Sequence, residues 1–196
     1  MTRRLLLVRH GRIAPGLVGR FIGATDAALD VSGEQQARSL AHRVQRLQPE
    51  RCFCSPLTRC RQTALAVVPH QSLQFDDRLR EIDFGQWEKR AWEEVVRDDP
   101  ESAARWTAFA PDFAFPGGER LDQFIERVRA AAEGLCRNEA ETVLAVTHGG
   151  VIRVMLCLLL GLELQKHVVF DVGYASLAVI DVLDRGNRLR TLEQVE

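Results

Sequence analysis

The sequence has little lysine, no excess of positive charge and no long hydrophobic run. Of its 26 basic residues only Lys89 and Lys166 are lysines, and the formal net charge is −1. Without a basic excess, we expect no nucleic-acid partner. The longest apolar stretch, 154–162, is too short to span a bilayer, and the first residues lack the apolar core of a signal peptide. We therefore expect a cytoplasmic protein with no membrane partner.

The sequence also lacks the cysteine and acidic patterns of a metal site. Its five cysteines form no even disulfide framework. Cys52 and Cys54 are separated by one residue, which is not a zinc-knuckle spacing, and no matching Cys/His pair follows. Reduced thiols are expected, and no acidic cluster suggests metal ligands. The sequence therefore predicts neither a metal nor another cofactor.

What is present is an alternation of strand-like and helix-like segments over 196 residues, a length that suits one domain with its own core. Strands are predicted at 5–8, 51–54, 73–75, 143–146 and 177–182. Helices are predicted at 33–47, from 55 onward, and at 87–97, 101–109, 121–136 and 149–160. Ser32 is the predicted cap of the first helix, and Ser55-Pro56 is the predicted start of the second.

This alternation predicts an α/β fold, a three-layer α/β/α sandwich with a mostly parallel central sheet. The segment 111–119 contains Pro116-Gly117-Gly118 and is predicted to be a loop. We expect residues 1–196 to form a single domain, with a small cap-like insertion around 84–120.

Two motifs with candidate chemistry end predicted strands. Arg9-His10-Gly11 follows the first strand, and Thr147-His148-Gly149-Gly150 lies between a strand and a helix. Ligand sites in open α/β sheets lie just beyond the carboxyl ends of strands. One cleft can therefore hold both histidines, while Gly11 allows a sharp turn and leaves room for a substrate.

Two further motifs supply a cation and carboxylates. Arg59 is predicted in the first turn of the helix that Ser55-Pro56 opens, where the positive end of the helix dipole favours an anion. Glu81 and Asp83 lie in an acidic segment held between apolar residues. Either of these two carboxylates is a candidate for the cleft.

The four motifs together fit phosphoryl transfer. Two arginines and a second histidine bind a phosphoryl group and spread its charge. A neutral imidazole can attack phosphorus and form a covalent intermediate. A carboxyl group can protonate the leaving alkoxide and later activate water. A histidine at one strand end alone is more often structural, but the joint pattern favours catalysis.

At these residues the chain resembles the histidine phosphatase superfamily, the phosphoglycerate-mutase-like proteins. The resemblance runs through Arg9-His10-Gly11, 23–37, 55–64 and 147–150, and so covers nearly the whole chain. It implies that His10 is the phosphorylated nucleophile and that Glu81 is the proton donor. It also implies a phosphate pocket formed by Arg9, Gly11, Arg59 and His148, the last of which is counted with the catalytic residues.

Within the superfamily, the segment 79–88 is most similar to the α-ribazole-5′-phosphate phosphatases of cobalamin assembly. Trp92, Trp106 and Pro116-Gly117-Gly118-Glu119, with the later Arg127-Val128, agree with that likeness. It implies a phosphatase that acts on α-ribazole 5′-phosphate. The alternatives are a broad-specificity sugar-phosphate phosphatase, a phosphoglycerate mutase and a non-catalytic phosphate-recognition module.

Two departures from the family pattern concern the substrate. Arg12 follows Gly11 where these enzymes often carry glutamate, and Gly16 stands where many carry an asparagine that contacts phosphate. Arg12 is a candidate contact for a second anionic group on the substrate, or else a solvated loop residue. The expected partner is a small phosphomonoester, and an edge contact near 169–177 leaves a homodimer open.

Overall fold

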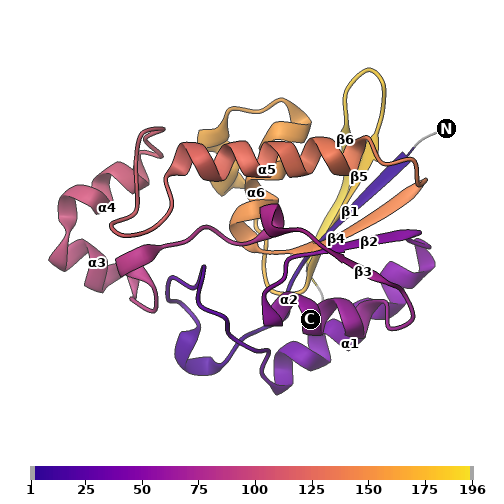
Figure 1. Cartoon of the computed structure of the whole chain (residues 1–196), viewed down its shortest axis with the longest axis horizontal. Coiled ribbons are helices and arrows are strands. Elements are labelled where there is room, and N and C mark those ends of the chain that lie inside the picture. Colours follow the sequence, from indigo (N-terminus) through magenta and orange to yellow (C-terminus); the bar gives the residue numbers. More distant parts are fainter. Residues whose placement is uncertain (1–2, 195–196) are drawn as a thin grey trace.

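The computed structural model describes residues 3–194, and its centre is one six-stranded sheet (Figure 1). The strands are β1 (Arg3–Arg9), β2 (Arg51–Cys54), β3 (Leu73–Phe75), β4 (Thr142–Thr147), β5 (Ser176–Val182) and β6 (Arg188–Gln194). Their order is β3-β2-β4-β1-β5-β6. The first four in that order are parallel, while β5 and β6 are antiparallel to their neighbours. The predicted α/β class and mostly parallel sheet are confirmed.

Helices cover both faces of the sheet. The structure has α1 (Val31–Arg46), α2 (Thr58–Val67), α3 (Trp92–Asp98), α4 (Pro100–Thr107), α5 (Leu121–Cys136) and α6 (Gly149–Leu160). Figure 1 shows α1 and α2 on one side of the sheet and α5 and α6 on the other, which makes three layers. Helices α3 and α4 lie together at one end of the molecule, in the segment predicted to be a cap-like insertion.

Strand β1 shows why its sequence is an unbroken apolar run. Successive side chains of a strand point to opposite faces of the sheet. Leu5 and Leu7 therefore pack in the core that includes α5 and α6, while Leu6 and Val8 pack in the core that includes α1 and α2. All four are at most 1% exposed. A strand buried on both faces cannot show polar alternation.

The predicted starts of the first two helices are wrong. Helix α1 begins at Val31, and its cap is Asp30, whose carboxylate accepts a hydrogen bond from the amide of Gly33 (2.7 Å). Helix α2 begins at Thr58, three residues after Ser55. The Thr58 amide donates to Asp26 (2.7 Å), so a residue from a distant loop caps this helix and local sequence cannot show it.

The predicted helix at 87–97 is also wrong in its first part. A short 3-10 turn, η3 (Gly85–Trp87), comes first, and α3 starts only at Trp92. Between them Lys89 has a φ of 66°, which a continuous right-handed helix does not allow. Trp87 is 1% exposed and packs among phenylalanines, so tertiary packing decides this segment.

Strand β6 was not predicted. Its residues are exposed or half-buried, because it is the last strand at one edge of the sheet. Charged side chains at an edge are a common protection against unwanted strand pairing. They also remove the apolar pattern by which a strand is predicted. Among residues 3–194, no helix combines the length and the apolar character needed to cross a membrane.

Candidate active site

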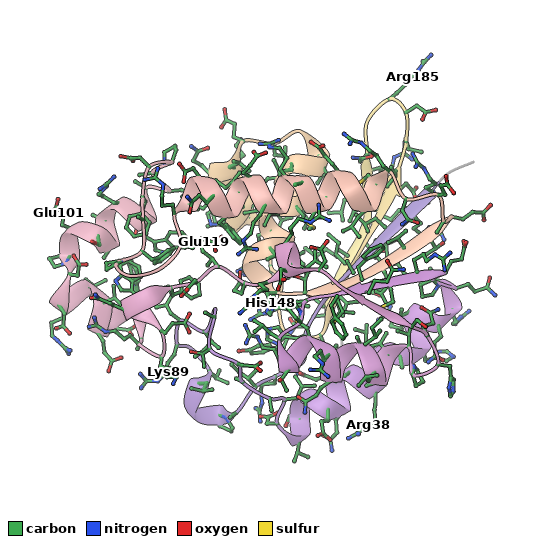
Figure 2. All side chains as sticks on the ribbon, in the orientation of Figure 1. Arg38, Lys89, Glu101, Glu119, His148 and Arg185 are labelled. Atoms are coloured by element: carbon green, nitrogen blue, oxygen red, sulfur yellow. The ribbon has the colours of Figure 1, made fainter. Side chains whose placement is uncertain are left out.

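Three motifs meet at the carboxyl edge of the parallel strands. Arg9 of β1 lies beside Thr147 of β4, and the His10 amide donates to the Thr147 carbonyl (3.0 Å). The rings of His10 and His148 are therefore neighbours, with centroids 5.2 Å apart in an edge-on arrangement. Strand β2 lies on the other side of β4 and leads into α2, which carries Arg59. Figure 2 shows His148 near the middle of the molecule.

His10 is held as a neutral imidazole with one free nitrogen. It is 5% exposed, and its Nδ1 lies 2.8 Å from the carbonyl oxygen of Gly11. Because a carbonyl only accepts, Nδ1 carries the proton and donates, which leaves the lone pair on Nε2. Burial lowers the pKa of His10 well below its usual value, and the charges of Arg9 and Arg59 lower it further. The ring is therefore uncharged at neutral pH.

Arg59 is fully buried and fixed by three acceptors. Its Nη1 and Nη2 donate to the carbonyl oxygens of Thr25 (2.7 Å) and Gly23 (2.8 Å), and its Nε donates to Nδ1 of His148 (3.2 Å). A guanidinium has five N–H groups. Two of them, one on each terminal nitrogen, are left for another acceptor such as a phosphate oxygen.

His148 holds this arginine in place. Since its Nδ1 accepts from Arg59, its Nε2 carries the proton and lies 2.8 Å from Oγ of Ser55. Burial lowers the pKa of His148 well below its usual value, and the charge of Arg59 adds to that shift. Both ring nitrogens thus have protein partners. The predicted contact of His148 with phosphate stays a prediction, while the structure shows it orienting Arg59.

Arg9 lies against the first turn of α6. Its Nη1 donates to the carbonyl of Val172 (2.7 Å), and its guanidinium stacks 4.2 Å from the ring centre of Tyr174. A side chain at Gly149 would come within 3.3 Å of the Arg9 guanidinium, so glycine suits this close approach. The buried Nε of Arg9 has no partner in the described part of the chain. This N–H group is available to an anion.

The structure separates the two candidate carboxylates. Glu81 Oε2 accepts from the amide of Gly150 (2.9 Å) at the start of α6, and Oε1 accepts from the amide of Ile82 (3.1 Å). Asp83 instead accepts from the amide of Gly85 (2.9 Å) and stabilises its own turn. Glu81 is therefore the carboxylate placed beside the Thr147–Gly150 motif.

Gly11 and Arg12 hold the loop after β1 against α1. The Gly11 amide donates to the Thr63 hydroxyl (3.1 Å), and a side chain at Gly11 would overlap the carbonyl of Gly33. The Arg12 Nε donates to Asp30 (2.8 Å) and its Nη2 to the hydroxyl of Ser32 (3.1 Å). This gives Arg12 a structural role at the start of α1. Its predicted contact with substrate stays a prediction.

A cavity of about 290 Å³ lies beside Arg9 and Glu81. Much of its wall is aromatic, with Phe21, Phe84, Trp106 and Phe109 among the lining residues, and Arg153 and His167 add positive or protonatable groups. The sequence did not predict a role for Arg153 or His167.

Arg153 had a local signal, because it is the one charged residue of α6 and lies one turn after Gly149-Gly150. His167 had none. It reaches the cavity from η4 (Leu164–Val169), with its ring 4.2 Å from that of Phe109. Within residues 3–194, no three His, Cys, Asp or Glu side chains are grouped so as to hold a metal ion.

The chain is similar to known proteins over nearly its whole length. A family model described as Histidine phosphatase superfamily (branch 1) matches residues 5–195. Phosphoserine phosphatase 1 of Hydrogenobacter thermophilus is 36% identical over 187 residues, 94% of this chain and 89% of that protein. The adenosylcobalamin/alpha-ribazole phosphatase of Salmonella typhimurium is 31% identical, over 96% of this chain and 95% of its own. The crystal structure of the alpha-ribazole phosphatase from Shigella flexneri superposes with a TM-score of 0.87 at 26% identity, covering 98% and 99% of the two chains.

Proposed function

Because this chain belongs to the histidine phosphatase superfamily, we propose that it hydrolyses phosphomonoesters through a phosphohistidine formed on His10. The observation that carries the proposal is the hydrogen bond from Nδ1 of His10 to Gly11 in a buried ring. This hydrogen bond keeps the proton on Nδ1 and leaves the lone pair of Nε2 as a neutral nucleophile. A nucleophile of this kind needs no proton removed before it attacks.

In the first step, the lone pair of His10 Nε2 forms a bond to phosphorus and the bond from phosphorus to the ester oxygen breaks. The electron pair stays on that oxygen, which takes a proton from the Glu81 carboxyl group. Arg9 and Arg59 bind the non-bridging oxygens, where charge is concentrated in the transition state.

In the second step, the Glu81 carboxylate takes a proton from water as the water oxygen attacks phosphorus. The bond between phosphorus and Nε2 breaks, and its electron pair returns to the imidazole. Orthophosphate leaves, and both His10 and Glu81 are restored. The arginines stabilise the transition state of this step as well.

For the substrate, we propose α-ribazole 5′-phosphate, which would give the protein a role in cobalamin assembly. Two observations support it. The cavity beside Glu81 has an aromatic wall that includes Phe21, Phe84 and Trp106, and such a wall suits a planar ring system. Curated relatives named adenosylcobalamin/alpha-ribazole phosphatase match most of the chain.

Phosphoserine is a second candidate, favoured by a different observation. Arg153 lines the same cavity, and its Nε donates to the carbonyl of Phe170 (3.0 Å), which leaves its terminal nitrogens for another acceptor. A carboxylate on the leaving group suits a planar guanidinium. The relative at 36% identity is named a phosphoserine phosphatase.

The test is phosphate release from α-ribazole 5′-phosphate, phosphoserine and 3-phosphoglycerate in parallel, with EDTA present and His10→Asn as the control. A higher kcat/KM for α-ribazole 5′-phosphate supports the first substrate, and a higher value for phosphoserine replaces it with the second. Isomer formation without free phosphate would identify a mutase. Phosphate binding without turnover of any ester would identify a recognition module and overturn the proposal.

A further inference from the structure

An ion pair outside the catalytic motifs binds the main chain on both sides of Glu81. Arg127 lies on α5. Glu119, which Figure 2 labels, lies just before that helix begins. The Arg127 Nε and Nη2 donate to the two carboxylate oxygens of Glu119, at 2.6 and 2.8 Å. The two side chains are 21% and 17% exposed. This is a bidentate pair that is largely shielded from water.

The rest of the Arg127 guanidinium binds the segment leading to Glu81. Nη1 donates to the carbonyl oxygens of Arg78 (3.0 Å) and Arg80 (2.6 Å), and Nη2 donates to the carbonyl of Glu81 (3.1 Å). With the two bonds to Glu119, all five N–H groups of the guanidinium are used. A rigid planar group thus holds three carbonyls in one geometry, which a lysine cannot do.

Glu119 fixes the chain on the other side of Glu81. Its Oε2 accepts from the amide of Asp83 (3.2 Å), and its own amide donates to the carbonyl of Asp83 (2.9 Å). The main chain is therefore held before, at and after Glu81. The Glu81 carboxylate is held separately, by the amides of Gly150 and Ile82.

We propose that Arg127 and Glu119 are positioning residues for the Glu81 carboxyl group. They hold its main chain so that the carboxyl group reaches the oxygen of the leaving group. Neither residue touches the reacting atoms. The inference rests on the proposed function, because it takes Glu81 as the proton donor. A displacement of about 1 Å in such a group costs on the order of 100-fold in rate.

The experiment compares phenyl phosphate with p-nitrophenyl phosphate, two esters of similar shape whose leaving groups differ in basicity. Nitrophenolate leaves readily without a proton, whereas phenolate depends on the acid. The quantity measured is kcat/KM, because the later hydrolysis of the phosphohistidine does not enter it. Arg127→Lys keeps the charge and removes the planar fork, and Glu119→Gln keeps the shape and removes the charge.

We expect each variant to lose about 30-fold or more in kcat/KM for phenyl phosphate, with p-nitrophenyl phosphate within about twofold of the wild type. Arg129→Lys is the matched control, because Arg129 is exposed on the same helix and contacts only Glu126 (3.7 Å) among the ion pairs of the described residues. It is expected to change neither value. Inhibition by orthophosphate is expected to stay unchanged in all three variants.

Equal losses for both esters would show a structural role, and no loss for either would show no role; each overturns the inference. If Arg127→Lys fails to fold, the same criteria apply to Glu119→Gln. Glu81→Gln is measured in parallel to separate the two claims. If Glu81→Gln shows no difference between the esters, the proposed role of Glu81 as the acid is wrong. If Glu81→Gln loses activity selectively for phenyl phosphate but the Arg127 and Glu119 variants do not, only the positioning role is wrong.

Discussion

Replacing Gly150 with alanine is expected to impair catalysis while leaving the fold intact. Gly150 is the second residue of α6, and its amide donates to Glu81 Oε2 (2.9 Å). An added Cβ would lie 2.5 Å from Glu81 Oε1 and 3.1 Å from its Cδ, where ordinary contacts begin at 3.4 Å. The carboxylate must therefore move by about 1 Å, because the main chain of the helix start is fixed between strand and helix.

The size of the effect follows from that displacement. A general acid accelerates a reaction by about 100-fold to 10,000-fold, and a misplacement of about 1 Å lowers the rate by on the order of 100-fold. We expect Gly150→Ala to lower kcat/KM for phenyl phosphate by about 100-fold. The clash is with the flexible end of a side chain, and alanine favours a helix over glycine by up to about 1 kcal/mol. The melting temperature should therefore stay level or rise while activity falls.

The matched control is Gly134→Ala on α5. There an added Cβ would meet only the far end of Arg78, at 3.7 Å. This variant should gain about 0.5–1 kcal/mol in free energy of unfolding and keep wild-type kcat/KM. Steady-state kinetics and thermal melting of both variants make the test. Wild-type turnover of phenyl phosphate by Gly150→Ala would refute the assignment of Glu81 as the acid in this geometry.

Two further predictions concern stability. The folded pKa values of His10 and His148 lie well below those of the unfolded chain, so the unfolded state binds more protons once the pH falls below about 6.5. The free energy of unfolding should then drop by up to about 1.4 kcal/mol per pH unit for each histidine. Urea denaturation between pH 7 and pH 5.5 measures this drop. A free energy of unfolding that does not change with pH would contradict the neutral imidazoles. Arg12→Ala should lower the free energy of unfolding by about 0.5–1 kcal/mol, because Arg12 loses its ion pair with Asp30 and its hydrogen bond to Ser32. We expect kcat/KM to stay unchanged. A selective loss for one substrate would instead support the predicted substrate contact of Arg12.

The core of the candidate site was predictable from local sequence. Leu5 to Val8 is a buried strand that ends at His10, and a similar run ends at His148, so a parallel sheet brings both to one edge. The place of Arg59 followed in the same way from the strand and helix around it. These predictions needed only apolar runs and the residues that end them.

The remaining features depend on contacts between distant segments. Ser55 was predicted to cap a helix, but its hydroxyl pairs with His148, 93 residues away. The cap of α2 comes from Asp26, which no pattern near Thr58 indicates. The residue pattern alone left Glu81 and Asp83 open, and only the family resemblance favoured Glu81; the structure separates them through the amide of Gly150, which donates to Glu81. In each case the decisive partner lies outside the local sequence.

In the proposed reaction a phosphoryl group is transferred to Nε2 of His10. The most direct test is rapid mixing with p-nitrophenyl phosphate, followed by alkaline quench and mass spectrometry of the peptides. We expect a phosphate on His10 that is stable to base and labile to acid. It should form before steady state and be absent from His10→Asn. Turnover by His10→Asn at the wild-type rate, or a wild-type enzyme that turns over with no phosphorylated His10 at any time, would contradict it.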